Sequence, residues 1–203
     1  MITKVIEGEF SKMIVVIMGL LAFIFFGIYD INQVKWKKSW LNGSFFIGFL
    51  GLVISTIVLL VSSKVFSEGT LLQLVMLIVS GGFFLLLLYT LFLALPFSST
   101  YVAKEKENTT KVCDGGMYGL CRHPGFLWFT AAYITLAIGI QNTTAAFSVA
   151  VFIICNFLYV LMQDRWTFPH MFEGYENYKK KVPFLIPTAG SIKTSFATIR
   201  KEG

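Results

Sequence analysis

Long apolar runs alternate with short polar segments along the chain. A helix needs roughly 20 residues to cross the hydrocarbon core of a bilayer, and five runs approach or reach that length, although the fourth is shorter. The pattern predicts an all-α integral membrane protein with five transmembrane helices. The runs are Met13 to Tyr29, Ser44 to Val61, Leu71 to Leu95, Phe126 to Ile140 and Ala145 to Met162.

The fourth and fifth helices are predicted to form a tight hairpin, because only residues 141–144 separate them. Pro124 suits the first turn of a helix and disfavours helical geometry in the residue before it, so the fourth helix is expected to begin there. The fifth helix is expected to continue until Pro169. A short cytoplasmic helix over residues 170–181, ended by Pro183, and a polar tail complete the chain.

The polarity of the chain changes at Pro96, where a turn-rich segment replaces the apolar runs. Residues 1–95 are therefore interpreted as a three-helix transmembrane scaffold. Residues 96–203 are interpreted as the catalytic part, made of a cytoplasmic loop, the hairpin and a C-terminal segment that caps a cofactor.

Composition and charge support a membrane protein and exclude several other classes. The chain is 56% hydrophobic and 14% charged, with a mean hydropathy of +0.72, which is too apolar for an ordinary soluble domain. Fourteen of the 17 basic residues fall on one side of the predicted topology, so the C-terminus is expected in the cytoplasm and the protein in the plasma membrane. The net charge of +6 thus reflects topology and gives no argument for nucleic acid. The three cysteines have no metal-ligand spacing, and no metal is expected.

The polar segment before the fourth helix is the strongest candidate site. Arg122 and His123 stand at the expected helix start, where free backbone amides favour an anionic group. Each residue also has a simpler interpretation. His123 can be structural, Arg122 a positive-inside anchor, and the nearby tyrosines members of an aromatic belt.

Two motifs together resemble a known family. The segment from Gly116 to Phe126 is similar to the G-x-Y-x-x-x-R-H-P-x-Y signature of the isoprenylcysteine carboxyl methyltransferase and phospholipid methyltransferase superfamily. The segment from Gln163 to Pro183 resembles that family's E-E-x-x-L-x-x-x-F-G-x-x-Y-x-x-Y-x-x-x-V-P pattern. Four departures are visible: Gln163-Asp164 replaces two glutamates, Phe126 a tyrosine, Thr167 a leucine and Met171-Phe172 the F-G pair.

The resemblance implies an S-adenosylmethionine-dependent methyltransferase that acts on a lipid-like or amphiphilic substrate at the cytoplasmic face. The chemistry of methyl transfer then gives the catalytic candidates: Arg122 or Arg165 would orient a carboxylate acceptor, and Asp164 or His123 would act as base for an amine or thiol acceptor. The cofactor-binding candidates are Lys111, Val112, Cys113, Tyr118, His123, Pro124, Gly125, Phe126, Gln163, Tyr175 and Tyr178. The sequence names neither the methyl acceptor nor the oligomeric state.

Two other classes of function remain open from the sequence. A membrane reductase of isoprenoids or sterols with related architecture would bind NADPH, whose phosphates also favour a helix start beside Arg122. A non-catalytic membrane protein that retains the fold is the second alternative, because the E-E and F-G positions are altered.

Overall fold

A computed structural model of the protein describes residues 2–63, 65–94, 110–112 and 115–202. These residues are predominantly helical, with one pair of two-residue strands. The chain divides into two compact units: the first comprises Met1–Gly81 and Ala131–Tyr159, and the second comprises Gly82–Thr130 and Val160–Gly203. Each unit is described by itself.

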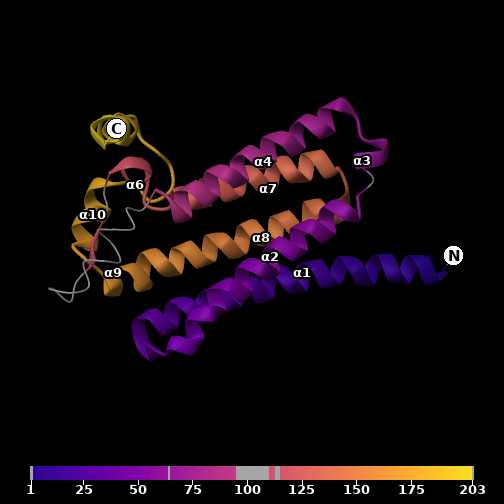
Figure 1. The fold of residues 1–203 in the computed structure, drawn as a ribbon, viewed down its shortest axis with the longest axis horizontal. Coiled ribbons are helices and arrows are strands. Elements are labelled where there is room, and N and C mark those ends of the chain that lie inside the picture. The colour runs from indigo at the N-terminus through magenta and orange to yellow at the C-terminus, as the bar shows by residue number, and fades with distance from the viewer. Residues whose placement is uncertain (1, 64, 95–109, 113–114, 203) are drawn as a thin grey trace. The chain divides into compact units, whose positions relative to one another are not determined.

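The first unit contains the N-terminal helices and the middle of the later apolar ones. Helix α1 (Ile2–Ile31) and helix α2 (Ser44–Val61) lie side by side (Figure 1). Between them are a π-helical turn η1 (Asn32–Trp36) and a 3-10 turn η2 (Ser39–Gly43), and after them come α3 (Val65–Glu68) and the first half of α4 (Leu71–Phe92). Parts of α7 (Pro124–Ile140) and α8 (Thr143–Met162) complete this unit.

Close packing of α1 on α2 depends on a small residue. A Cβ atom built on Gly48 would lie 2.7 Å from the Ala22 carbonyl oxygen, so the two backbones approach more closely than any larger residue permits. Asn32 then closes the connection between the helices. Its amide donates to the Lys38 carbonyl at 2.9 Å and its oxygen accepts from the Lys38 backbone N–H at 2.8 Å.

Polar side chains also join the apolar helices of the first unit. The hydroxyls of Thr56 and Tyr133 lie 2.8 Å apart, and Ser80 donates to the Ala132 carbonyl at 2.8 Å. Tyr159 of α8 donates to the buried Asp30 of α1 at 3.2 Å. Such hydrogen bonds between helices substitute for the hydrophobic effect, which is weak where the solvent is lipid.

Four helical segments of the described chain are long and apolar enough to cross a membrane: Met13–Trp36, Ser39–Glu68, Leu71–Phe92 and Thr143–Met171. The protein is therefore an integral membrane protein. Helix α7 is apolar but shorter, so the fifth crossing and the hairpin of α7 with α8 stay predictions. The division of the chain into scaffold and catalytic part likewise stays a prediction.

The second unit gathers short elements around the beginning of α7 and the end of α8. Strand β1 (Thr110–Lys111) runs parallel to β2 (Phe172–Glu173), with Thr110 opposite Phe172. Helix α6 (Gly116–Leu120) precedes α7, while α8 continues into the π-helical turn η4 (Gln163–Thr167) and α9 (Phe168–Met171). Helix α10 (Tyr175–Lys181) starts after Gly174, whose φ of 78° suits glycine.

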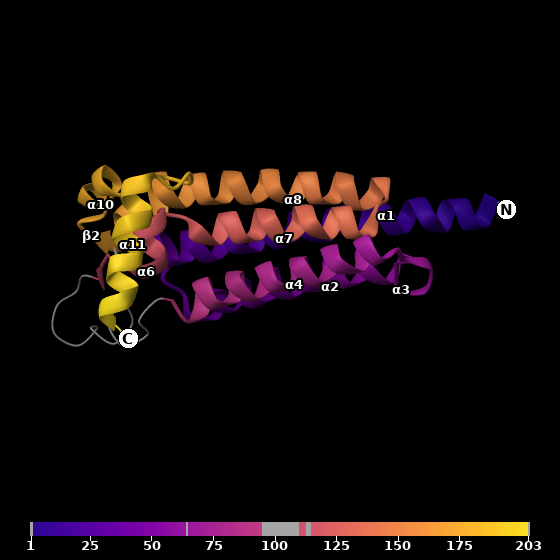
Figure 2. The ribbon, with the colours of Figure 1, turned by 90° about the horizontal axis from the view of Figure 1, so that it is seen from above.

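The expected polar tail is a helix. Residues 189–202 form α11 (Ala189–Glu202), which crosses α6 within the second unit (Figure 2). The Gly116 amide donates to Thr198 Oγ1 at 2.9 Å, and Ser195 donates to the Gly116 carbonyl at 2.6 Å. The expectation of a tail was wrong: Ile192 and Phe196 stand four residues apart, which is a helical spacing, and the tertiary hydrogen bonds to Gly116 hold the helix in place.

Candidate functional site

The site begins where α7 begins. Helix α7 starts at Pro124, as the sequence predicts, and the Phe126 amide donates to the His123 carbonyl at 3.1 Å. Both Pro124 and His123 are buried. The helix start therefore lies inside the second unit, and the binding of an anionic group by its free amides stays a prediction.

Aromatic rings enclose the His123 imidazole. The Phe168 ring stacks on it with centroids 5.5 Å apart and an interplanar angle of 12°, and the Phe184 ring meets it edge-on at 5.3 Å. Phe168 starts α9 and Phe184 follows the proline that ends α10, so two separate segments close over the same imidazole.

The π-helical turn η4 accompanies the burial of Asp164. In this turn the Phe168 amide donates to the Gln163 carbonyl, five residues back, which widens the helix by one residue relative to an α-helix. Asp164 and Thr167 are buried, whereas Arg165 between them is exposed. Single π turns within helices are frequent at functional sites.

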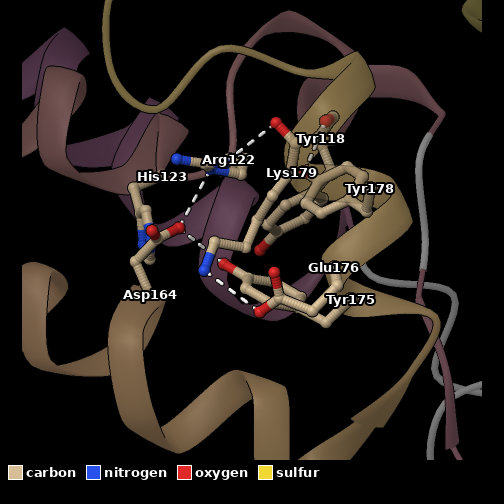
Figure 3. A network of polar contacts seen from close by, with 8 residues as sticks. All are labelled: Tyr118, Arg122, His123, Asp164, Tyr175, Glu176, Tyr178 and Lys179. Atoms are coloured by element: carbon tan, nitrogen blue, oxygen red, sulfur yellow. Dashed lines mark hydrogen bonds and ion pairs between the residues drawn. The ribbon is translucent and has the colours of Figure 1, made fainter.

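Three side chains converge on one carboxylate oxygen of Asp164 (Figure 3). Arg122 Nε lies 2.9 Å from Oδ1, the Tyr175 hydroxyl donates to Oδ1 at 2.8 Å, and His123 Nε2 lies 3.4 Å away. The Arg122 and Asp164 side chains are only 11% and 7% exposed, so this is a buried ion pair. The Nε–H is not well directed for a hydrogen bond within the described residues, so the contact is mainly ionic.

Burial sets the protonation states in this cluster. It lowers the pKa of His123 below its usual value, and the hydrogen bond to the Asp164 carboxylate opposes that shift only in part. Burial also raises the pKa of Tyr175, and the negative carboxylate that its hydroxyl contacts raises it further. The cluster therefore contains one compensated charge pair, Arg122 and Asp164, and two neutral groups that can donate hydrogen bonds.

Backbone groups hold Arg122 on the C-terminal segment. Its amide donates to the Pro183 carbonyl at 2.9 Å and its Nη1 donates to the Lys179 carbonyl at 3.1 Å. Its guanidinium carbon also lies 5.5 Å from the centroid of the Phe184 ring. Arg122 thus fastens the start of α7 to the end of α10.

Two tyrosines add further hydrogen bonds between separate segments of the second unit. Tyr178 donates to the Tyr118 carbonyl at 2.7 Å, and Tyr118 donates to the Thr90 carbonyl of α4 at 3.1 Å. Tyr175, Tyr178 and Val182 form a buried core, against which Val112, Phe168 and Phe172 pack. The helix predicted over residues 170–181 thus begins at Tyr175, and Tyr175 and Tyr178 lie on its buried face.

The structure brings together only some of the residues singled out from the sequence. Arg122, His123, Asp164 and Tyr175 meet at one point (Figure 3), while Val112 and Tyr178 belong to the adjoining core and Tyr118 accepts a hydrogen bond from Tyr178. Gly125, Phe126 and Gln163 are half-buried. For Lys111 the structure describes only the backbone, in β1, and Cys113 lies outside the described residues.

Sequence reasoning missed Phe168 and Phe184, the two rings that enclose His123. Both stand next to prolines that were used only as helix boundaries, Pro169 and Pro183. An aromatic residue beside a boundary proline was the available signal. The π turn left no signal in the sequence.

A comparison with family models gives one match, and it includes the residues of this site. The model described as 3-oxo-5-alpha-steroid 4-dehydrogenase matches residues 64–189, which is more than half of the chain. The chain belongs to this 3-oxo-5-alpha-steroid 4-dehydrogenase family. Comparisons with curated proteins and with solved structures gave no match.

Membership in the 3-oxo-5-alpha-steroid 4-dehydrogenase family corrects the interpretation from the sequence. The assignment to the isoprenylcysteine carboxyl methyltransferase family was wrong, and so were the methyltransferase activity and the cofactor S-adenosylmethionine. The family is one of steroid reductases, whose typical cofactor is NADPH. The whole Arg122–Asp164–Tyr175 cluster lies within the matched residues.

The physical reason for this error lies in what the shared motif residues do. Arg122, His123 and Tyr175 contact Asp164, and Arg122 and Tyr178 also donate to backbone carbonyls of other segments, so these residues specify how the second unit packs. Residues with that role identify an architecture, and two families of related architecture can share them while binding different cofactors. The four departures from the methyltransferase pattern were the warning in the sequence.

Proposed function

We propose that this protein is an NADPH-dependent membrane reductase that saturates a carbon–carbon double bond conjugated to a ketone in an apolar, steroid-like or isoprenoid lipid. The observation that carries this proposal is the family match over residues 64–189. The apolar helices support it, because they place the protein where such a lipid dissolves.

The residues of the second unit fit NADPH in their chemistry. Its phosphates require cations, and Arg165, Lys180 and Lys181 are exposed on η4 and α10. Its amide and ribose groups require hydrogen-bond partners. Within the described part of the chain, Trp128 Nε1 and Thr167 Oγ1 are buried without one. We assign Arg165, Lys180 and Lys181 to the phosphates.

When bound, NADPH supplies the hydride for such a reduction, and a proton must reach the neighbouring carbon. In our proposal Arg122 and Asp164 are positioning residues, because their ion pair holds the start of α7 on the C-terminal segment. His123 and Tyr175 are the two neutral hydrogen-bond donors of this cluster, and their burial excludes water from it. In this proposal the four residues hold a rigid polar surface that orients the cofactor and the substrate.

We further propose that the C-terminus faces the cytoplasm, in the plasma membrane. The distribution of Lys and Arg supports this orientation. It would place the exposed cations of η4 and α10 on the side where NADPH is available.

The purified protein in detergent tests the proposed function. We expect NADPH to raise the melting temperature and S-adenosylmethionine to leave it unchanged. We also expect a steroid with a 4-en-3-one group to be consumed together with NADPH, giving a product heavier by two hydrogens. Failure of NADPH both to stabilise the protein and to be oxidised would contradict the proposal.

The cofactor assignment has a test of its own. Replacing Arg165 or Lys180 by Gln should weaken NADPH binding by roughly tenfold each, the value of about 1.4 kcal/mol for a lost charge-assisted contact. Lys193→Gln is the matched control, because Lys193 is also exposed but lies beyond the matched residues. Equal effects of all three substitutions would indicate non-specific charge attraction.

A further inference from the structure

Helix α11 uses its polar side to contact the rest of the protein. Ser191 and Ser195 are buried, and Ser195 and Thr198 form the hydrogen bonds to Gly116 described above. An amphipathic helix on a soluble protein does the opposite and buries its apolar side. The orientation of α11 therefore leaves Ile192 and Phe196 uncovered by the second unit.

Two exposed apolar side chains lie close together on α11. Ile192 is 40% exposed and Phe196 is 69% exposed, and a spacing of four residues places them on one face of α11. Ile186, just before the helix, is 81% exposed. Exposed apolar residues grouped in this way indicate a surface for binding protein or membrane.

Charge and direction favour membrane. The segment contains Lys193, Arg200 and Lys201 against a single acidic residue, Glu202, which complements anionic lipid headgroups. Figure 2 shows α11 running across the direction of the first turns of α7 within the second unit. If α7 crosses the membrane as the sequence predicts, a helix that runs across its direction lies along the bilayer surface.

We propose that α11 is a membrane-surface helix, with Ile186, Ile192 and Phe196 inserted among the lipids of an anionic bilayer. Such helices bury their apolar face at the boundary of headgroups and acyl chains while basic residues remain at the headgroups. Because α11 begins at the last matched residue, this proposal is independent of the family assignment and of the reductase activity.

Spin labels on the full-length protein in nanodiscs test the proposal. In a variant whose three cysteines are replaced by serine, single labels are placed by Phe196→Cys and Ile192→Cys, and control labels by Thr194→Cys and Ala197→Cys. Thr194 and Ala197 are also exposed but lie on other sides of the helix. Collision with oxygen reports lipid, and collision with a water-soluble nickel complex reports water.

In discs that contain phosphatidylglycerol, we expect the oxygen-to-nickel ratio to be at least threefold higher at positions 192 and 196 than at 194 and 197. Equal ratios at all four positions would overturn the proposal. Protection of position 196 from both reagents would also overturn it, because a protein partner or a second copy would then cover the helix. In discs of phosphatidylcholine alone the difference should shrink, and an unchanged difference would refute the role of charge.

A second measurement covers the case in which the cysteine-free variant does not fold. Phe196→Trp and Ala197→Trp are compared in the natural background, where the four native tryptophans contribute equally to both. Brominated lipids should quench the added fluorescence at least twofold more at position 196. Equal quenching would overturn the proposal.

Discussion

Asp164→Asn removes the charge on which the buried cluster depends and keeps the shape of the side chain. Arg122 Nε is then 2.9 Å from a neutral amide, with its own side chain only 11% exposed. Removing one partner of a buried ion pair costs about 3 to 5 kcal/mol, because the remaining charge has neither water nor a counter-charge. The Asn oxygen still accepts from Tyr175, so we expect the lower end, about 3 kcal/mol.

The measurement is thermal unfolding of the full-length protein in detergent. For a chain of this size each kcal/mol corresponds to about 2 to 4 °C, so the melting temperature should fall by about 6 to 12 °C. Glu176→Gln is the matched control, because it neutralises a carboxylate whose side chain is 68% exposed in its pair with Lys179. Its effect should stay below about 1 kcal/mol.

A double variant shows whether the unpaired charge is the cause. With Arg122→Met added to Asp164→Asn, no uncompensated charge remains. The double variant should then be more stable than the sum of the single losses predicts, by about 1 to 3 kcal/mol. A loss for Asp164→Asn no greater than that of the control, or strict additivity of the two substitutions, would refute the reasoning.

Three further predictions concern other parts of the structure. Gly48→Ala should lower the melting temperature more than Gly27→Ala, because only at Gly48 would the added Cβ meet the α1 backbone, at 2.7 Å, while nothing lies within 4 Å of Gly27. Tyr178→Phe should lower the free energy of unfolding by about 1 kcal/mol, because the hydrogen bond to the Tyr118 carbonyl is lost, and an unchanged urea titration would contradict this. Because burial lowers the pKa of His123, the unfolded chain binds the extra proton first, so stability should fall as the pH decreases below about 6.5. His123→Gln should flatten that pH dependence, and identical pH profiles would contradict it.

The membrane helices could be predicted from the sequence because their signal is local. Apolar length and the geometry of Pro124 located the runs and the start of α7 without any tertiary information. Helix α1 begins at Ile2, before the run at Met13, because charged residues are tolerated in a helix outside the hydrocarbon. The docking of helix α11 could not be predicted in the same way, because its hydrogen-bond partner, Gly116, lies more than 70 residues earlier in the sequence.

The candidate site could be predicted only as a set of residues. Arg122, His123, Asp164 and Tyr175 were each named from the sequence, but their convergence on Oδ1 of Asp164 occurs with the π turn and across separate segments. The interactions expected of them also differed. Arg122 was expected to bind an external anion, whereas its charge is paired inside the protein. Sequence motifs therefore located the cluster and gave the wrong cofactor.

The parallel pairing of Thr110 with Phe172 has a consequence for biosynthesis. The second unit is built from two stretches of chain, and the ribosome makes Asp164 41 residues after His123. Until those residues emerge, the arginine before His123 has no carboxylate to neutralise it. Completion of this unit is thus a late event for the nascent protein, and a translation product that stops before Asp164 would leave Arg122 without its ion-pair partner.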